Sequence, residues 1–180
     1  STVYTRSLEA AQRYLDLADA SETAEKAAEF LHEFETVYGR VQEIPKELRP
    51  KDHNSPENVD IQLSMLERAS RRYLDLARVA STPDETKPWL QKFDSYQDWA
   101  VFVLTESKEN KNLKMFSEAP RRMRVEMYEQ ASERFLDLAN ASKWPEEAAS
   151  YMEYFEKYDK RHQIAEKLSP VHHNSPEGMD

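Results

Sequence analysis

The six residues Arg13–Ala18 read RYLDLA, and this stretch decides the fold because it occurs three times. RYLDLA returns at Arg72–Ala77, and the close variant RFLDLA stands at Arg134–Ala139. The leading arginines, at positions 13, 72 and 134, are separated by 59 and then 62 positions. Periods of this length are typical of tandem helical repeats. The sequence therefore predicts three units of ~60 residues, which we place at 1–60, 61–120 and 121–180.

Apolar residues around each copy recur at helical spacing. The three matching sets are Ser7, Ala10, Tyr14 and Leu17; Leu66, Ala69, Tyr73 and Leu76; and Tyr128, Ala131, Phe135 and Leu138. Steps of three and four residues place each set on one side of an α-helix. A second, looser series follows in each unit, and in the first it comprises Ala27, Leu31, Phe34, Tyr38 and Val41. Each unit is thus predicted to be an α-hairpin.

The predicted fold is all-α, because the chain contains only two glycines and tight β-turns usually require more. In the third unit the second helix is predicted to bury Ala148, Met152, Phe155 and His162, with Tyr151 and Tyr158 beside them. The apolar run Trp99–Leu104 is predicted to be a deeply buried helix end. One hairpin cannot bury both of its apolar faces, so the units are expected to stack, either as a short solenoid or as fused helical bundles.

Helix starts can be read from capping residues. Ser55 precedes Pro56 and Glu57, a combination that suits a helix N-terminus. The same approach places the start of the second helix at Ser21 in the first unit, at Ser81 or Thr82 in the second, and shortly before Pro145 in the third. Pro45 and Pro170 are expected to help end second helices.

The block His53–Glu57 (HNSPE) returns at His173–Glu177, whereas the middle unit lacks it and is the divergent one. Because the second block resembles a helix start near the end of the chain, we expect that a fourth unit followed Asp180 in a longer array. Ser55 and Ser175 each precede a proline, so they are also candidate phosphorylation sites. The alternative interpretation is a capped linker without a regulatory role.

Composition excludes several classes of function. A net charge of −9 disfavours nucleic acid as a partner. The chain contains no run of 18 apolar residues, so we expect no membrane insertion. The chain has no cysteine, which excludes disulfides and favours a cytoplasmic location. No nucleophile turn or glycine-rich phosphate loop occurs, so the chain is predicted not to be an enzyme and to need no cofactor. Glu29 and His32 have a spacing used by metal-binding bundles, but their context predicts no metal site.

The recurring arginine and aspartate are the candidate partner-binding residues. They are Arg13, Asp16, Arg72, Asp75, Arg134 and Asp137. A spacing of three places each pair within reach on one helix face. One interpretation is structural, either as a local ion pair or as a polar contact between units. The other is a ladder of identical contacts, each of which binds one copy of a repetitive or oligomeric protein partner.

The leading functional hypothesis is a structural scaffold that acts through multivalent protein–protein contacts, including contacts with neighbouring copies of the same repeat. The motivating observation is three similar units without a catalytic constellation. The alternative is a helical binding module that holds one peptide or ligand in a groove centred on the second unit. That unit carries both Trp89 and Trp99, which would line the groove.

Overall fold

A computed structural model describes residues 2–107, 113 and 118–167. Its elements are six α-helices and one short 3-10 helix. In chain order they are α1 (Val3–Asp19), α2 (Ala24–Glu43), η1 (Lys46–Leu48), α3 (Pro56–Val79), α4 (Pro83–Glu106), α5 (Glu118–Ala141) and α6 (Pro145–Lys167). The part of the chain that the structure describes contains no strand, so the predicted all-α class is confirmed. No helix within these residues is long and apolar enough to cross a membrane.

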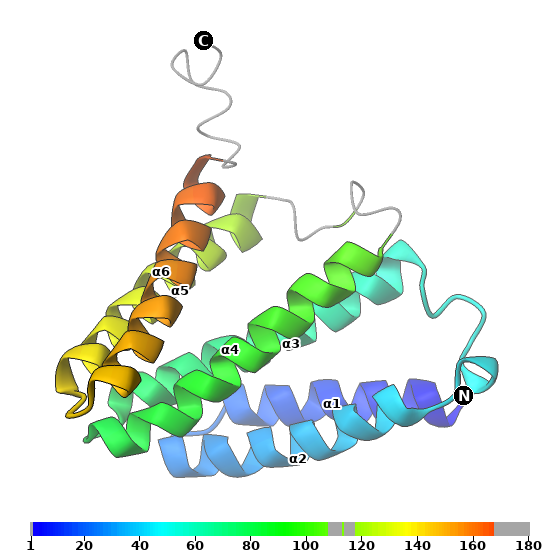
Figure 1. The fold of residues 1–180 in the computed structure, drawn as a ribbon. Coiled ribbons are helices and arrows are strands. Elements are labelled where there is room, and N and C mark those ends of the chain that lie inside the picture. Colours follow the sequence, from blue (N-terminus) through cyan, green and yellow to red (C-terminus); the bar gives the residue numbers. More distant parts are fainter. Residues whose placement is uncertain (1, 108–112, 114–117, 168–180) are drawn as a thin grey trace.

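The helices pack as three consecutive pairs, here called hairpin 1 (α1 and α2), hairpin 2 (α3 and α4) and hairpin 3 (α5 and α6). Hairpin 2 lies between the other two, since α3 contacts α1, α2 and α5, and α4 contacts α5. In Figure 1 the three hairpin turns gather on one side, while the opposite ends of the hairpins spread apart like a fan.

Two of the predicted polar caps are confirmed and one is wrong. Ser55 caps α3, and its Oγ accepts a hydrogen bond from the Asn58 amide at 3.3 Å. Thr82 caps α4 in the same way. The predicted start of α2 at Ser21 is wrong, because Thr23 is the cap and accepts from the Lys26 amide. The Ser21 hydroxyl instead donates to the Leu17 carbonyl and helps to end α1.

The buried face of α1 differs from the predicted one. Its buried residues are Tyr4, Leu8, Ala11, Leu15 and Ala18. The predicted set that begins at Ser7 and includes Tyr14 is only partly buried. The equivalent sets in α3 and α5 are buried as predicted. The physical reason is position, because the described chain has no hairpin on the outer side of hairpin 1 to cover this face.

Two further burial predictions need correction. The core of α6 is built from Tyr151 and Tyr158, whereas Met152 is 36% exposed and Phe155 is only half-buried. The run Trp99–Leu104 is helical as predicted, but it is not deeply buried, since Phe102 is 62% exposed. An all-apolar helix end thus faces solvent on one side, because hairpin packing covers only part of its circumference.

Candidate protein-binding groove

A groove of about 780 Å³ runs along α1, α3 and α5, the first helices of the three hairpins. Helix α3 supplies most of its lining, with α1 on one edge and α5 on the other. The lining residues are Gln12, Asp19, Pro56, Glu57, Asp60, Ile61, Leu63, Ser64, Glu67, Arg68, Arg71, Arg72, Pro120, Met123, Arg124 and Met127. The size is within the range of pockets that bind ligands or inserted side chains.

The groove combines an apolar base with charged edges. Ile61, Leu63, Met123 and Met127 provide the apolar surface, and methionine adapts easily to different binding partners. Four arginines and four carboxylates surround this surface, so its charge is mixed. An arginine in such a setting offers paired donors that match a carboxylate on a partner. The groove therefore offers an apolar surface bordered by charged groups of both signs.

Glu67 is the carboxylate of the groove with a shifted proton affinity. Its side chain is 19% exposed and lies 3.4 Å from the Arg124 Nε. Burial raises the pKa of Glu67 to about 6, although the charge of Arg124 acts in the opposite direction. Loss of solvation outweighs the ion pair here. We therefore expect the α3–α5 contact to change with pH around this value.

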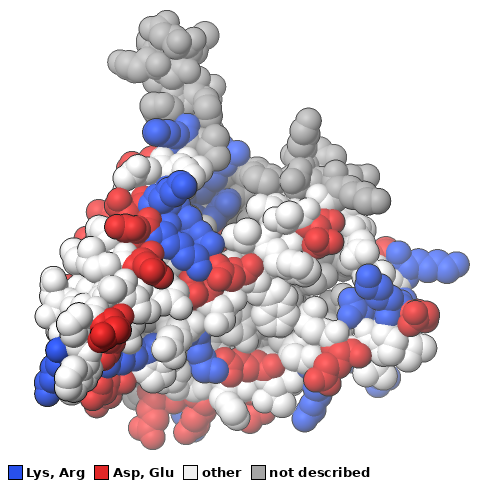
Figure 2. All heavy atoms as spheres, in the orientation of Figure 1, with Lys and Arg blue, Asp and Glu red and all other residues white. Residues whose placement is uncertain are grey.

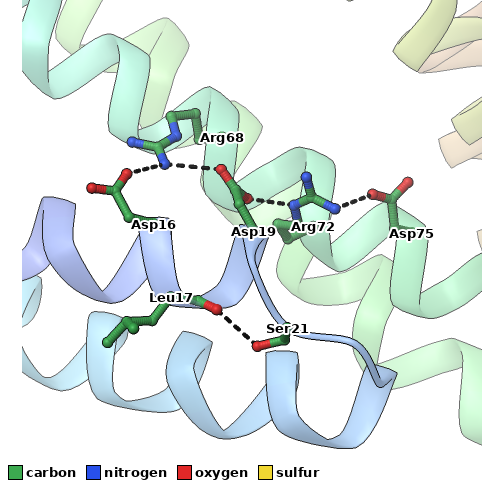
Figure 3. A network of polar contacts seen from close by, with 7 residues as sticks. All are labelled: Asp16, Leu17, Asp19, Ser21, Arg68, Arg72 and Asp75. Atoms are coloured by element: carbon green, nitrogen blue, oxygen red, sulfur yellow. Dashed lines mark hydrogen bonds and ion pairs between the residues drawn. The ribbon is translucent and has the colours of Figure 1, made fainter.

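A polar network joins α1 to α3 beside the groove (Figure 3). One nitrogen of Arg68 donates to Asp16 at 2.7 Å and to Asp19 at 2.9 Å. Arg72 donates to Asp19 at 2.6 Å and to Asp75, on its own helix, at 3.2 Å. Each arginine therefore contacts two carboxylates. The network holds hairpins 1 and 2 together near their turns.

The structure thus places the recurring Arg/Asp residues in different surroundings. Arg72 with Asp75 and Arg134 with Asp137 form the expected pairs within one helix, at 3.2 and 3.3 Å. In the first copy Asp16 instead pairs with Arg68 of α3. Arg13 is exposed on α1. Among these residues, Arg72 also lines the groove.

A second contact region joins α2 to both helices of hairpin 2, and the sequence prediction missed it. Glu35 of α2 accepts a hydrogen bond from the Tyr73 hydroxyl at 2.5 Å and one from the Lys92 ammonium at 2.7 Å. Phe34 packs against Tyr96, with ring centroids 6.0 Å apart. Burial raises the pKa of Tyr73, and the acidic neighbour Glu35 adds to the rise.

Hairpins 2 and 3 meet through a similar set of groups. Asp94 of α4 accepts from the Tyr158 hydroxyl at 2.6 Å and from the Lys157 ammonium at 2.7 Å. Phe93 packs against Tyr158, with ring centroids 5.1 Å apart. The sequence carries a signal for both regions, since Phe34 with Glu35 and Phe93 with Asp94 are Phe-acid pairs 59 positions apart.

Asp98 extends the contact between α4 and α6. Its carboxylate accepts hydrogen bonds from Lys157 and from Arg161, at 3.0 and 2.9 Å. Burial acts to raise the pKa of Asp98, but these hydrogen bonds and the two positive charges together lower it. Figure 2 shows acidic and basic side chains interspersed over the visible face, with uncharged surface between them.

The two tryptophans of the alternative groove occupy different surroundings. Trp89 lines a shallower pocket of about 740 Å³ against α2, together with Phe30, His32 and three glutamates. Trp99 packs into an aromatic cluster, with ring centroids 4.9 Å from Tyr38. Trp89 therefore borders a surface pocket between hairpins 1 and 2, whereas Trp99 contributes to the packing between them.

The remaining candidates have simple structural settings. Ser55 is the α3 cap described above, and Ser175 lies outside the described residues. Glu29 pairs with Lys26 at 3.2 Å, and His32 is exposed. No cluster of three or more His, Asp or Glu side chains suited to a metal ion occurs within residues 2–107, 113 and 118–167.

Comparison with known proteins gives no family for this chain. The sequence matches no protein-family model and no curated protein, and the fold matches no solved structure.

Proposed function

We propose that this chain is a non-enzymatic scaffold built from tandem helical hairpins, and that it binds a protein partner in the groove along α1, α3 and α5. The observation that carries the proposal is the groove itself, which is about 780 Å³ in volume and is lined by the first helix of every hairpin. A surface shared by successive units is how stacked helical repeats commonly bind extended partners.

Matching contacts at the two hairpin junctions support the idea of a tandem array. Phe34 meets Tyr96 at one junction, and the residues that correspond to them, Phe93 and Tyr158, meet at the other. The correspondence follows the offsets of 59 and 62 positions that relate the three RYLDLA copies. Arg68 with Asp19 and Gln130 with Arg78 are also corresponding polar contacts. Repeated use of one contact geometry is what stacking of similar units requires.

The groove chemistry indicates the kind of partner. A helical or extended segment with apolar side chains would cover Ile61 and Met123, and a carboxylate on it would meet Arg71. Arginine and methionine are enriched at protein interfaces for these reasons. The recurring Arg/Asp residues would contribute at the edge, through Arg72. Several weak contacts along one surface would then add up through multivalency.

The proposal is tested by placing a photo-reactive amino acid at Met123 in the full chain and recovering the cross-linked partner from native cells. The double variant R71E/M123E should lose this partner, because it replaces a cation and an apolar contact with carboxylates. The control E153K changes an exposed residue of α6 outside the groove and should keep it. Unchanged binding by R71E/M123E would refute the groove as the binding surface.

The triple variant D16A/D75A/D137A separates the groove from the recurring polar face. If the partner depends on that face, the triple variant loses binding while R71E/M123E retains it. If the groove carries the binding, we expect the triple variant to weaken it only modestly. Circular dichroism should show the same helical signal for all variants, since the substituted residues lie on the surface.

The pocket beside Trp89 supports a second candidate, a binding module for a small cationic group. Trp89 offers an aromatic surface, and Glu25, Glu29 and Glu33 place negative charge around it. Aromatic surfaces and carboxylates together attract organic cations. Titration with a methylated lysine peptide, followed by tryptophan fluorescence, tests this idea, and the W89A variant is the control. Absence of saturable binding to the parent chain would remove this candidate.

A further inference from the structure

One face of hairpin 3 is exposed, whereas the side chains at the matching positions of hairpins 1 and 2 are buried. This terminal face consists of Leu136, Met152, Phe155 and Glu156. Met152 is 36% exposed, Leu136 and Phe155 are half-buried, and Glu156 is exposed. Three large apolar side chains beside one carboxylate form a surface that another protein element could cover.

The corresponding positions in hairpins 1 and 2 are covered. They are Leu15, Leu31, Phe34 and Glu35 in hairpin 1, and Leu74, Leu90, Phe93 and Asp94 in hairpin 2. All six apolar members are at most 1% exposed. In both hairpins the next hairpin along the chain packs on these residues, whereas the described chain has no hairpin beyond hairpin 3.

The two existing interfaces specify what covers such a face. In each, the phenylalanine meets a tyrosine ring of the next hairpin, at 6.0 Å for Phe34 and 5.1 Å for Phe93. In each, the adjacent carboxylate accepts one hydrogen bond from a tyrosine hydroxyl and another from a lysine. Acid, lysine and tyrosine therefore meet at both junctions. The donors stand at different positions, since Tyr73 and Lys92 lie on α3 and α4 whereas Tyr158 and Lys157 both lie on α6.

We infer that the terminal face is a docking site for a helical hairpin that presents tyrosine and lysine side chains, with a tyrosine ring contacting Phe155 and Glu156 accepting from a tyrosine hydroxyl and a lysine. The inference rests on the proposed scaffold function, because it extends the same stacking geometry by one step. Continuity with two interfaces that share the Phe–Tyr ring contact and use the same kinds of donor, together with the negative charge of Glu156, supports this choice of partner.

A second, unmodified copy of this chain does not fit the site. In hairpin 1 the positions that match Lys92 and Tyr96 of hairpin 2 are occupied by Glu33 and Val37. Docking hairpin 1 of a second copy on the terminal face would place Glu33 opposite Glu156. Like charges at that position oppose association, and Val37 lacks the ring and the hydroxyl.

The full chain itself provides the probe. The variant E33K/V37Y gives hairpin 1 the residues that hairpin 2 carries at the matching positions, and Tyr14 already matches Tyr73. We expect E33K/V37Y to self-associate head to tail in sedimentation velocity experiments, with an association constant at least about tenfold above that of the parent chain. Adding E156K or F155D to the same variant should abolish the gain. The control is E153K, an exposed position on α6 outside the face.

The absence of native cysteine allows a direct check of the geometry. Lys157 contacts Asp98 at 2.9 Å, and the matching positions for docking between copies are Thr36 and Lys160. In the E33K/V37Y background, chains with T36C mixed with chains with K160C should form cross-links between the two cysteines. Circular dichroism on every variant verifies that the helices remain intact.

Three results would overturn the inference. They are a monomeric E33K/V37Y chain at every concentration, association that survives E156K and F155D, and equally strong head-to-tail association of the parent chain. None of these results bears on the groove, since Met123 and Arg71 are unchanged in all of the variants. Failure of the docking site is thus distinguishable from failure of the proposed groove function.

Discussion

Hairpins 2 and 3 differ in what surrounds them, and the difference shows where the stability of the molecule lies. Hairpin 2 is covered on both sides, and its Leu74, Leu90 and Phe93 are at most 1% exposed. Hairpin 3 is covered on one side, and the residues at the matching positions, which include Leu136 and Phe155, are partly exposed. Similar sequences therefore contribute different amounts of burial according to their place in the stack. In stacked repeats, much of the stability comes from the interfaces between neighbours.

The largest expected effect is a difference in stability loss between alanine variants of Phe93 and Phe155. Phe93→Ala should lower the free energy of unfolding by about 3–5 kcal/mol, because it removes a fully buried ring between two hairpins. Phe155→Ala should cost about 1 kcal/mol, since much of that ring remains in contact with water. Urea unfolding followed by circular dichroism measures both. Equal losses would mean that the terminal face is as well packed as the interior.

The next prediction concerns the pH dependence of stability, which should have opposite signs for the α3–α5 contact and the α4–α6 contact. The pKa of Glu67 is raised from 4.5 to about 6 in the folded chain, so the folded state binds more protons than the unfolded state between these values. Stability should therefore fall as pH rises from 4.5 to 6, by about 2 kcal/mol at most. Urea unfolding at several pH values measures the slope, and Glu67→Gln should reduce it.

Asp98 should show the opposite sign. Its pKa is lowered in the folded chain, so its contribution to stability is present above its ordinary value and is lost as pH falls through the folded value. Asp98→Asn should therefore destabilise the chain at neutral pH and should make stability less sensitive to acid. A slope of the same sign for both carboxylates would contradict this assignment.

A smaller effect compares the two tyrosine hydroxyls at the junctions. Tyr73→Phe removes the hydrogen bond to Glu35, and Tyr158→Phe removes the one to Asp94. Each should cost about 1–2 kcal/mol, because the acceptor is charged but retains its lysine. Similar losses in thermal or urea unfolding would show that the two hydroxyls contribute equally, although they come from non-matching positions. A neutral result at only one of them would show that the two junctions differ.

The smallest expected effect is the difference in stability between losing a polar contact that joins two hairpins and losing one within a single helix. Asp19→Ala removes a carboxylate that accepts from both Arg68 and Arg72, and should cost about 1 kcal/mol. Asp137→Ala removes only a pair with Arg134 on the same exposed helix surface, and should cost about 0.3 kcal/mol. Both differences should shrink in high salt. A larger loss for Asp137→Ala would reverse this ranking.

Most of the local structure can be predicted from the sequence. The wrong or missing predictions mainly concern which distant side chains contact a residue. Ser55 and Thr82 are caps because a hydroxyl before the first helical residues satisfies a free amide, which is a property of neighbouring residues. Ser21 was misassigned because Thr23, two residues later, offers the same chemistry. The candidate Arg/Asp pairs were identified, but the partner of Asp16 was not. Arg68 is 52 residues away, and no local pattern specifies such a pair.

By itself the sequence determined that the chain is helical, where most helices begin, and which residues recur, because spacing and capping act over a few residues. Only the tertiary structure decided which apolar face each helix buries, that α1, α3 and α5 border a groove, and that Glu67 is shielded from water. Those properties depend on the angle between hairpins and on which hairpin has a neighbour on each side. Identical RYLDLA segments in hairpins 1 and 2 therefore have different surroundings, with Tyr73 buried and Tyr14 partly exposed.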